Sequence, residues 1–311
     1  MTLQQLRYVV TAAEAGTITE AANKLYISQP SLTSAIHELE KEMGIVIFNR
    51  TNKGISPSRE GDDFLGYARQ LLEQAAILED RYKGGNGGKK QFCVSTQHYS
   101  FAVNAFVDLI KEYGQEEYDF SLRETQTYEI IEDVAAMRSE IGVLFLSDFN
   151  EIAIGKILKD HDLEFHQLFI TSPHVFISRT HPLAGKSIIS NEELEIYPYL
   201  SFEQGEHNSL YFAEEVFSAE MISPWERKKN IRVRDRATLF NLLIGLNGYT
   251  VCSGVIDKKL NGKDIIAVPL ADKSDMRIGY ITHKKAMLSR LGDSYLEALR
   301  KYITGQKSAR P

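Results

Sequence analysis

Cysteine is scarce in this sequence. Cys93 and Cys252 stand far apart among 311 residues, without a CxxC pair or any zinc-ligand spacing. This scarcity argues against a small secreted domain held together by disulfides and against a cysteine zinc site. We therefore interpret both thiols as structural.

Long apolar runs are also missing. No run approaches the roughly 20 residues that span a bilayer, and the first residues show no basic-then-apolar signal pattern. We expect a cytoplasmic protein without a membrane partner. Its length predicts two or three domains.

The common catalytic motifs are absent from the sequence. It contains no HExxH, no GxxxxGK[ST], no GxSxG and no GxGxxG after a strand. His161 and His166 have the wrong spacing for one helix face. These absences favour a regulator or binding protein over an enzyme, and they predict no catalytic residues, no metal and no cofactor.

Positive charge is not in excess in the N-terminal part. Residues 1–90 hold 11 Lys and Arg against 11 Asp and Glu, and the whole chain has a net charge of −6. DNA-binding domains usually carry an excess of positive charge, which this part of the chain lacks. We therefore expect modest affinity for nonspecific DNA, which makes dimerisation more important.

Residues 18–43 have the pattern of two short helices around a tight turn. The first is expected from about Thr19 to Tyr26, and the second follows Ser28, a candidate N-cap, with Pro30 in its first turn. At about 100° per residue, one stripe of the second helix is apolar and contains Leu32, Ile36, Leu39 and Met43. The opposite side is polar and contains Pro30, Thr33, Ser34, His37 and Lys41, with Gln29 near its rim.

An exposed helix start rich in Gln, Ser and Thr supplies the groups that contact base edges and phosphates. The alternative is a plain surface helix pair, because hydroxyl-rich helix starts are common. A preceding helix is expected over Leu3–Ala15 and ends at Gly16. Its predicted inward face contains Leu3, Leu6, Val10 and Ala13.

A short hairpin is expected after the second helix. It has a strand over Ile45–Phe48, a turn over Thr51–Gly54 and a return at Ile55–Ser56. Arg50 and Lys53 at this hairpin suit phosphates or the minor groove. The alternative is that they are ordinary solvated loop cations.

A long helix is expected from about Ser58 to Tyr82. Apolar residues recur along it at alternating steps of four and three, a heptad seam formed by Phe64, Ala68, Leu71, Ala75, Leu78 and Tyr82. The seam predicts a homodimer, although a single helix could also bury this stripe on its own domain. The glycine-rich segment 84–90 that follows predicts a hinge.

Strands and helices alternate beyond the hinge, which predicts an α/β fold. The expected helices are Phe101–Tyr113, Tyr128–Arg138, Asn208–Met221, Ala237–Leu246 and Leu288–Ile303. The expected strands are Phe92–Ser95, Asp119–Arg123, Ile141–Leu146, His174–Ser178, Tyr199–Phe202, Ile231–Val233, Tyr249–Cys252, Ile265–Pro269 and Arg277–Thr282. Open α/β sheets bind ligands beyond the carboxyl ends of their strands.

Several of these strand ends carry hydroxyls. The candidate ligand-binding residues are Ser95, Thr96, Gln97, Thr125, Thr127, Ser201, Phe202, Glu203 and Thr250, with His98 as a weaker candidate. Hydroxyls and backbone N–H groups at helix starts favour a small anion such as a carboxylate. The alternative for each is ordinary helix capping. Glu203 would repel an acid but could hold an amino group.

The stretch from Thr2 to Gly61 resembles the N-terminal winged helix-turn-helix of LysR-type transcriptional regulators. The first helix, the Gln-Pro helix start, the LEKEMG ending, IFNRT and SREG carry the resemblance. It implies a winged helix-turn-helix over 1–58, a linker or dimerisation helix with its hinge over 59–88, and a two-lobed effector domain over 89–311 of the periplasmic-binding-protein type 2. Lobe I would span about 89–162 and 269–304, and lobe II about 163–268, with crossovers near Asp162–Leu168 and Ile266–Leu270.

The resemblance also implies partners and sites. The partners are double-stranded promoter DNA, further copies of this chain in a homodimer or homotetramer, and RNA polymerase. DNA contacts are expected from Thr19, Gln29, Pro30, Ser31, Thr33, Ser34, His37, Arg50 and Lys53. We expect a small-molecule effector that is amino-acid-like or related to sulfur metabolism. The family often carries a longer basic residue where Ser34 stands, which shifts base readout toward His37.

Overall fold

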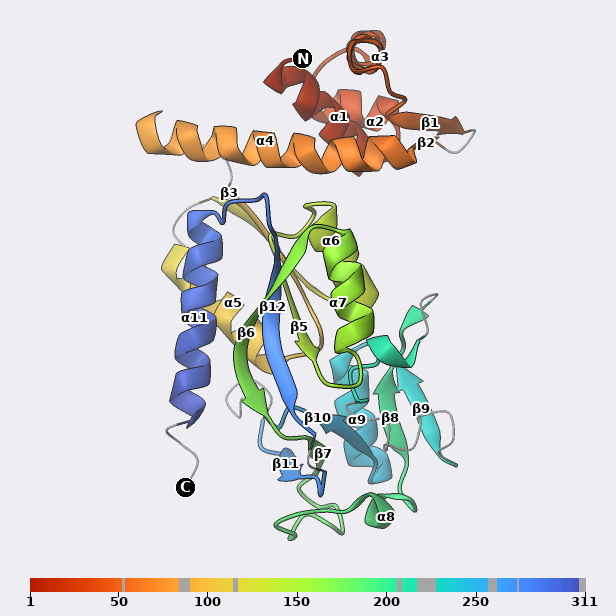
Figure 1. The fold of residues 1–311 in the computed structure, drawn as a ribbon, viewed down its shortest axis with the longest axis vertical. Coiled ribbons are helices and arrows are strands. Elements are labelled where there is room, and N and C mark those ends of the chain that lie inside the picture. Colours follow the sequence, from red (N-terminus) through yellow and green to blue (C-terminus); the bar gives the residue numbers. More distant parts are fainter. Residues whose placement is uncertain are drawn as a thin grey trace. The chain divides into compact units, whose positions relative to one another are not determined.

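The computed structural model describes residues 1–51, 54–83, 90–113, 117–205, 209–216, 228–256, 262–272 and 274–307. The chain forms two compact units. The first is built on residues 1–88, and the second holds residues 89–311 apart from the short segment 135–138. Figure 1 shows short helices, a hairpin and a long helix in the first unit. No helix in the described residues is long and apolar enough to span a membrane.

The first unit begins with three capped helices, α1 (Leu3–Ala15), α2 (Ile18–Lys24) and α3 (Gln29–Met43). Thr17 caps α2, and Ser28 caps α3 by accepting the N–H of Ser31 at 3.3 Å. Gly16 ends α1 with a φ of 69°, a conformation that glycine adopts without strain. The predicted pair of helices around a tight turn is confirmed, although α2 begins and ends slightly earlier than expected.

The core of this unit is formed by the inner faces of the three helices. Its buried side chains include Leu6, Val9, Ala12, Ala21, Ala22, Leu32, Ile36 and Leu39. Met43, which the spacing places inside, is 41% exposed, since the helix ends there at Gly44. The predicted inward face of α1 is confirmed for Leu6, which is buried, and for Val10 and Ala13, which pack half-buried against the core, but Leu3 is 45% exposed. Neighbouring apolar residues such as Val9 and Val10 give α1 two possible inner rows, and spacing alone does not decide between them.

The hairpin consists of β1 (Phe48–Thr51) and β2 (Gly54–Pro57), which pair antiparallel. The first strand therefore begins at Phe48, and the expected strand over Ile45–Phe48 is wrong. Glu40 explains the difference, because its carboxylate accepts the N–H groups of Ile47 at 2.8 Å and Phe48 at 3.2 Å.

The long helix α4 (Arg59–Lys83) is anchored at its start to the hairpin. The Ser58 hydroxyl accepts the N–H of Gly61 at 2.9 Å, and the Ser58 N–H donates to the Ile47 carbonyl at 2.9 Å. Leu65 is buried in the core formed by the three helices. The first turns of α4 therefore pack into the core of the first unit.

The second unit contains two five-stranded sheets. The first has the order β4-β3-β5-β12-β6, in which β12 runs antiparallel to both neighbours. Its strands are β3 (Lys90–Thr96), β4 (Tyr118–Glu124), β5 (Ile141–Leu146), β6 (Leu163–Thr171) and β12 (Met276–His283). Its helices are α5 (Ser100–Tyr113), α6 (Thr127–Ala135), α7 (Glu151–Asp160) and α11 (Arg290–Lys307). We call this part lobe I.

The second sheet, which we call lobe II, has the order β11-β7-β10-β8-β9. Its strands are β7 (His174–Ser178), β8 (Tyr199–Phe202), β9 (Asn230–Val233), β10 (Tyr249–Cys252) and β11 (Ile265–Pro269). The helices α8 (Asn191–Leu194) and α9 (Arg236–Leu246) belong to this part of the chain. The predicted two-lobed α/β architecture is confirmed. In Figure 1 the sheet of lobe I lies above the sheet of lobe II.

Two local expectations in this unit need correction. The first crossover lies after Thr171, later than the expected Asp162–Leu168, because β6 pairs along its length with β12 in the first sheet. The return crossover lies between β11 and β12. The expected helix Asn208–Met221 is replaced, in its described part, by the 3-10 turn Leu210–Phe212 followed by extended Ala213. Residues 206–208 and 217–227 lie outside the described residues.

Candidate functional site

The outer side of α3 carries the polar residues that the sequence placed there. Gln29, Pro30, Ser31, Ser34 and His37 are exposed, and Thr33 is half-buried. The Gln29 amide donates to the Thr33 hydroxyl at 3.3 Å, so the two side chains lie together. Amide and hydroxyl groups at a capped, rigid helix start are able to pair with base edges.

Three further predicted DNA contacts lie outside α3. Thr19 in the first turn of α2 and Arg50 in β1 are both exposed. Lys53 lies outside the described residues.

The predicted heptad seam of α4 divides into two parts. Phe64 packs against the core of its own unit, and Ala68 is buried. Beyond them Ala75 is half-buried, while Leu71 is 46% and Leu78 is 60% exposed. The side chain of Tyr82 is not among those that the structure describes. The early seam residues are thus used within the protomer, and the apolar side chains of Leu71 and Leu78 remain accessible.

The predicted ligand-binding residues in lobe I have two different environments. Ser95 is fully buried, and its hydroxyl donates to Asp133 at 2.6 Å, which also binds Arg123 at 2.8 Å. The buried Thr96 hydroxyl donates to the Gln97 carbonyl at 2.8 Å. Thr125 donates to Glu129. These three hydroxyls are therefore satisfied within lobe I.

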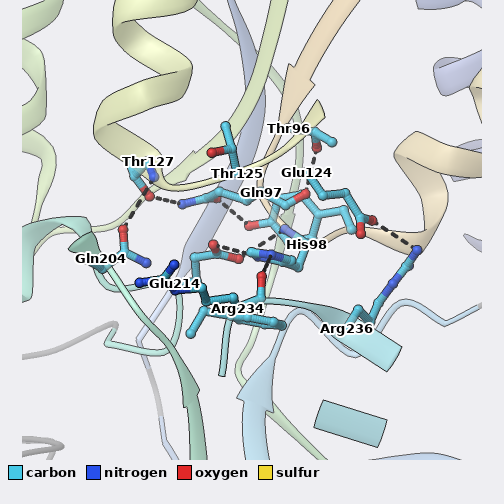
Figure 2. Close-up of polar contacts among 12 residues, drawn as sticks. Thr96, Gln97, His98, Glu124, Thr125, Thr127, Gln204, Glu214, Arg234 and Arg236 are labelled. Carbon is cyan, nitrogen blue, oxygen red and sulfur yellow. Dashed lines mark hydrogen bonds and ion pairs between the residues drawn. The ribbon is translucent and has the colours of Figure 1, made fainter. Parts of the chain in front are cut away.

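Gln97 and Thr127 instead form a bridge to lobe II (Figure 2). The Gln97 amide donates to the Thr127 hydroxyl at 2.6 Å, and that hydroxyl donates to the Phe212 carbonyl at 2.8 Å. The Thr127 N–H donates to Gln204 at 3.3 Å. All of these side chains are buried, so the bridge is protected from water.

His98 makes the second contact between the lobes (Figure 2). Its Nδ1 lies 2.9 Å from one Glu214 oxygen, and the His98 backbone N–H donates to the other oxygen at 3.0 Å. The imidazole stacks on Phe202 with 3.6 Å between ring centres, and its Nε2 lies 3.3 Å from the Arg234 carbonyl. Burial lowers the pKa of His98, but the charge and hydrogen bond of Glu214 outweigh burial and raise it overall.

Arg236 of lobe II makes the third contact, with Glu124 of lobe I at 2.9 Å. Glu203, expected to hold an amino group, instead pairs with the exposed Arg234 at 2.7 Å. Ser201 is buried in β8. Neither Glu203 nor Ser201 lines the pocket described next.

A small pocket of about 40 Å³ lies behind His98. Its walls include the expected Phe202 and Thr250 together with Glu214, Glu215, Arg236 and Phe240. The volume is enough for about three waters, so a metabolite can bind here only if the contacts between the lobes rearrange. These contacts, with others such as the Ser100 hydroxyl on the Val255 carbonyl at 3.3 Å, hold the two lobes together around a charged interior.

Glu215 has the most perturbed carboxyl group in this pocket. It is 1% exposed, and one oxygen accepts the Phe202 N–H at 2.8 Å. The other oxygen has no hydrogen-bond partner in the part of the chain that the structure describes. Burial, and then the charge of Glu214, raise its pKa to about 8. Sequence reasoning missed Glu214 and Glu215 by assigning them to an ordinary helix, although two acids between apolar residues in FAEEVF were an available signal.

We predict that Glu215→Gln stabilises the fold in alkaline solution. A carboxyl whose pKa is raised on folding lowers stability as pH rises from its unfolded value near 4.5 through its folded value near 8. The raised pKa of His98 acts in the same direction, because its stabilisation is lost as pH rises through the folded value. At pH 9 the glutamine variant should therefore gain roughly 2–4 kcal/mol over the parent.

Urea unfolding at pH 5 and pH 9 measures this difference, with Glu203→Gln as a matched surface control. Equal stabilities of the parent and Glu215→Gln at both pH values would contradict the raised pKa of the buried Glu215 carboxyl.

The thiols and the pocket give no sign of metal or disulfide chemistry among the described residues. Cys93 and Cys252 are free, and burial raises the pKa of the Cys252 thiol. No group of three His, Cys, Asp or Glu residues suited to a metal lies within the described part of the chain.

Two protein-family models match this chain. Residues 3–62 match the bacterial regulatory helix-turn-helix protein, lysR family, and residues 92–304 match the LysR substrate binding domain. The first match lies in the first compact unit and the second match, apart from residues 135–138, in the second unit.

Curated relatives agree with these matches. The chain is 24% identical to the uncharacterized HTH-type transcriptional regulator YbhD of Escherichia coli, over 98% of this chain and 93% of that protein. It is 40% identical to the regulator TfdS of Cupriavidus pinatubonensis, but that match spans only 29% of this chain and 30% of TfdS.

Solved structures share the fold. A full-length OxyR variant from Pseudomonas aeruginosa has a TM-score of 0.64 at 19% identity, covering 96% of this chain and 98% of that one. Full-length CbnR in complex with its target DNA has a TM-score of 0.54 at 19% identity, covering 97% of this chain and 100% of CbnR.

Proposed function

This chain belongs to the LysR family of DNA-binding transcriptional regulators with an effector-binding domain, and on that premise we propose that it places the outer side of α3 in the major groove of promoter DNA. The carrying observation is the exposed row of amide, hydroxyl and imidazole groups on a helix whose other side is locked in the core. A rigid support lets such groups discriminate between bases. Thr19, Arg50 and Lys53 are proposed to contact the DNA backbone.

Gln29→Ala and Thr33→Ala are each predicted to weaken binding to the cognate site by about 1–3 kcal/mol, roughly fivefold to 150-fold. The loss follows if each makes a base contact, and nonspecific binding should change little. Fluorescence anisotropy on cognate and scrambled duplexes measures both affinities.

Glu38→Gln is the control for this experiment. Glu38 is exposed on α3 but lies nine residues from Gln29, about 180° around the helix. Removing its charge should change the affinity for cognate and scrambled duplexes by the same factor. The ratio of specific to nonspecific affinity then stays unchanged. An equal loss on both duplexes in the alanine variants would contradict base readout.

We propose that two copies of the chain pair through α4. The accessible Leu71 and Leu78, with Ala75 between them, support this pairing. Burial of such side chains against a second helix removes apolar surface from water. Paired subunits would present two α3 helices to a near-palindromic site. Assembly into a tetramer and contact with RNA polymerase are further proposals that rest on the family.

We propose that a small-molecule effector binds in the cleft between the lobes, between residues such as Gln97, Thr127, Phe202 and Thr250. The buried contacts that close the cleft support this role, since an entering ligand must rearrange them. That the effector is amino-acid-like or related to sulfur metabolism stays a proposal from the sequence. A change in lobe arrangement would then reach the DNA through the paired helices.

A further inference from the structure

We propose that the effector carries a cationic nitrogen, which binds against the carboxylates of Glu214 and Glu215, and an acceptor oxygen that faces Arg236. This inference rests on the cleft being the effector site. It concerns the chemical class of the ligand and not whether a ligand binds.

Unpartnered buried atoms around the pocket show what the ligand must supply. One Glu215 oxygen, the Thr250 hydroxyl and one Arg236 nitrogen have no hydrogen-bond partner among the described residues. All three residues line the pocket, and Glu215 and Thr250 are almost completely buried. Buried polar groups are nearly always satisfied, so these atoms mark positions for ligand donors and an acceptor.

The charges of the cleft are not balanced. Arg236 pairs with Glu124, and the imidazole of His98 pairs with Glu214. Among the described residues that line the pocket, no further cation remains to pair with Glu215. An ionised carboxylate in a buried site is costly unless a positive charge is beside it. A ligand ammonium group would supply that missing charge.

The aromatic wall of the pocket suits the same ligand. Phe202 and Phe240 line it together with the two glutamates. The imidazole of His98 already lies flat on Phe202 with Glu214 at its edge, so this wall accommodates a nitrogen heterocycle held by a carboxylate. Cations gain further stabilisation over aromatic faces.

An anionic effector fits these residues less well. Among the described residues of the pocket, the cations His98 and Arg236 both already have carboxylate partners. A carboxylate ligand alone would add a negative charge beside Glu214 and Glu215. A molecule with both an ammonium and an oxygen acceptor satisfies all the open positions, as an amino acid or amino alcohol does.

Thermal unfolding of the full chain at pH 8.5 tests the proposal, with methylammonium, choline, ornithine and ethanolamine as probes. Each is compared with sodium chloride of equal ionic strength and with acetate and benzoate. We expect at least one ammonium probe to raise the melting temperature of the parent in a saturable way. Glu215→Gln should weaken that binding at least tenfold, while Glu203→Gln, outside the pocket, should leave it unchanged.

Two results would overturn the proposal. One is that no ammonium probe raises the melting temperature above the salt control. The other is that acetate or benzoate stabilises the chain and Glu215→Gln does not weaken that effect, which would leave the cleft as an effector site for anions. DNA binding by α3 is measured separately on the same preparations, so its failure is distinguishable from both.

Discussion

Replacing Leu71 and Leu78 together with aspartate is expected to weaken binding to a DNA site with two half-sites by at least about 100-fold. Both side chains are accessible on α4 beyond the turns that belong to the core. Paired charges at these positions would prevent a second helix from covering them. When one dimer binds two half-sites with its two α3 helices, the linkage raises the affinity by about 10²–10⁴-fold. A monomer loses this gain.

Sedimentation equilibrium and a gel-shift titration measure this result on the full chain. Ile152→Asp is the matched control, since Ile152 is 87% exposed on α7 in the other unit. The control should remain dimeric and bind DNA as the parent does. A stable dimer in the Leu71 and Leu78 double variant would show that the subunits pair elsewhere.

Gly61→Ala is expected to destabilise the DNA-binding unit by about 3–5 kcal/mol. A Cβ built on Gly61 would lie 2.0 Å from the carbonyl oxygen of Ile47, and both are backbone positions that cannot move aside easily. Helix α4 would have to shift away from the segment that leads into the hairpin. Since whole domains are stable by only about 5–15 kcal/mol, this change should also abolish specific DNA binding.

Gly155→Ala gives the comparison for that variant. Gly155 lies inside α7, and a Cβ added there would have no atom of a neighbouring segment within 4 Å. Alanine there should stabilise the helix by about 0.5–1 kcal/mol. Urea unfolding followed by circular dichroism measures both variants. An unfolding midpoint for Gly61→Ala close to that of the parent would contradict the close approach of α4 to Ile47.

The spacing of apolar residues along the chain was sufficient to predict most helices and strands. The apolar stripe of α3 placed its polar residues outside, because Leu32, Ile36 and Leu39 leave one inner face possible. The fully buried run Ile141–Leu146 was predicted with its observed bounds, because its continuous apolar residues suit a central strand.

Long-range pairing was the main source of error. The strand Leu163–Thr171 joins lobe I only by pairing with Met276–His283, and no local pattern contains that information. The two hydroxyls of Ser95 and Thr250 looked equivalent in sequence. The Ser95 hydroxyl donates to Asp133, whereas the Thr250 hydroxyl has no hydrogen-bond partner within the described ranges, and this difference depends on the fold around them.

The charged interior of the cleft was the least predictable part. Glu214 and Glu215 were assigned to a helix that the described residues do not form. Their environment comes from His98 and Phe202, which lie far from them in sequence. Burial of a carboxyl is a property of the assembled lobes and not of the segment that carries it.

Footprinting of the full chain on the DNA site that it selects from a random pool tests the central claim most directly. Two α3 helices held by one dimer should protect two major-groove segments about 10 base pairs apart, or a multiple of that spacing. Gln29→Ala should reduce protection in both segments together. Protection of a single segment, or protection unaffected by changes on α3, would contradict the proposed reading of DNA by paired helices.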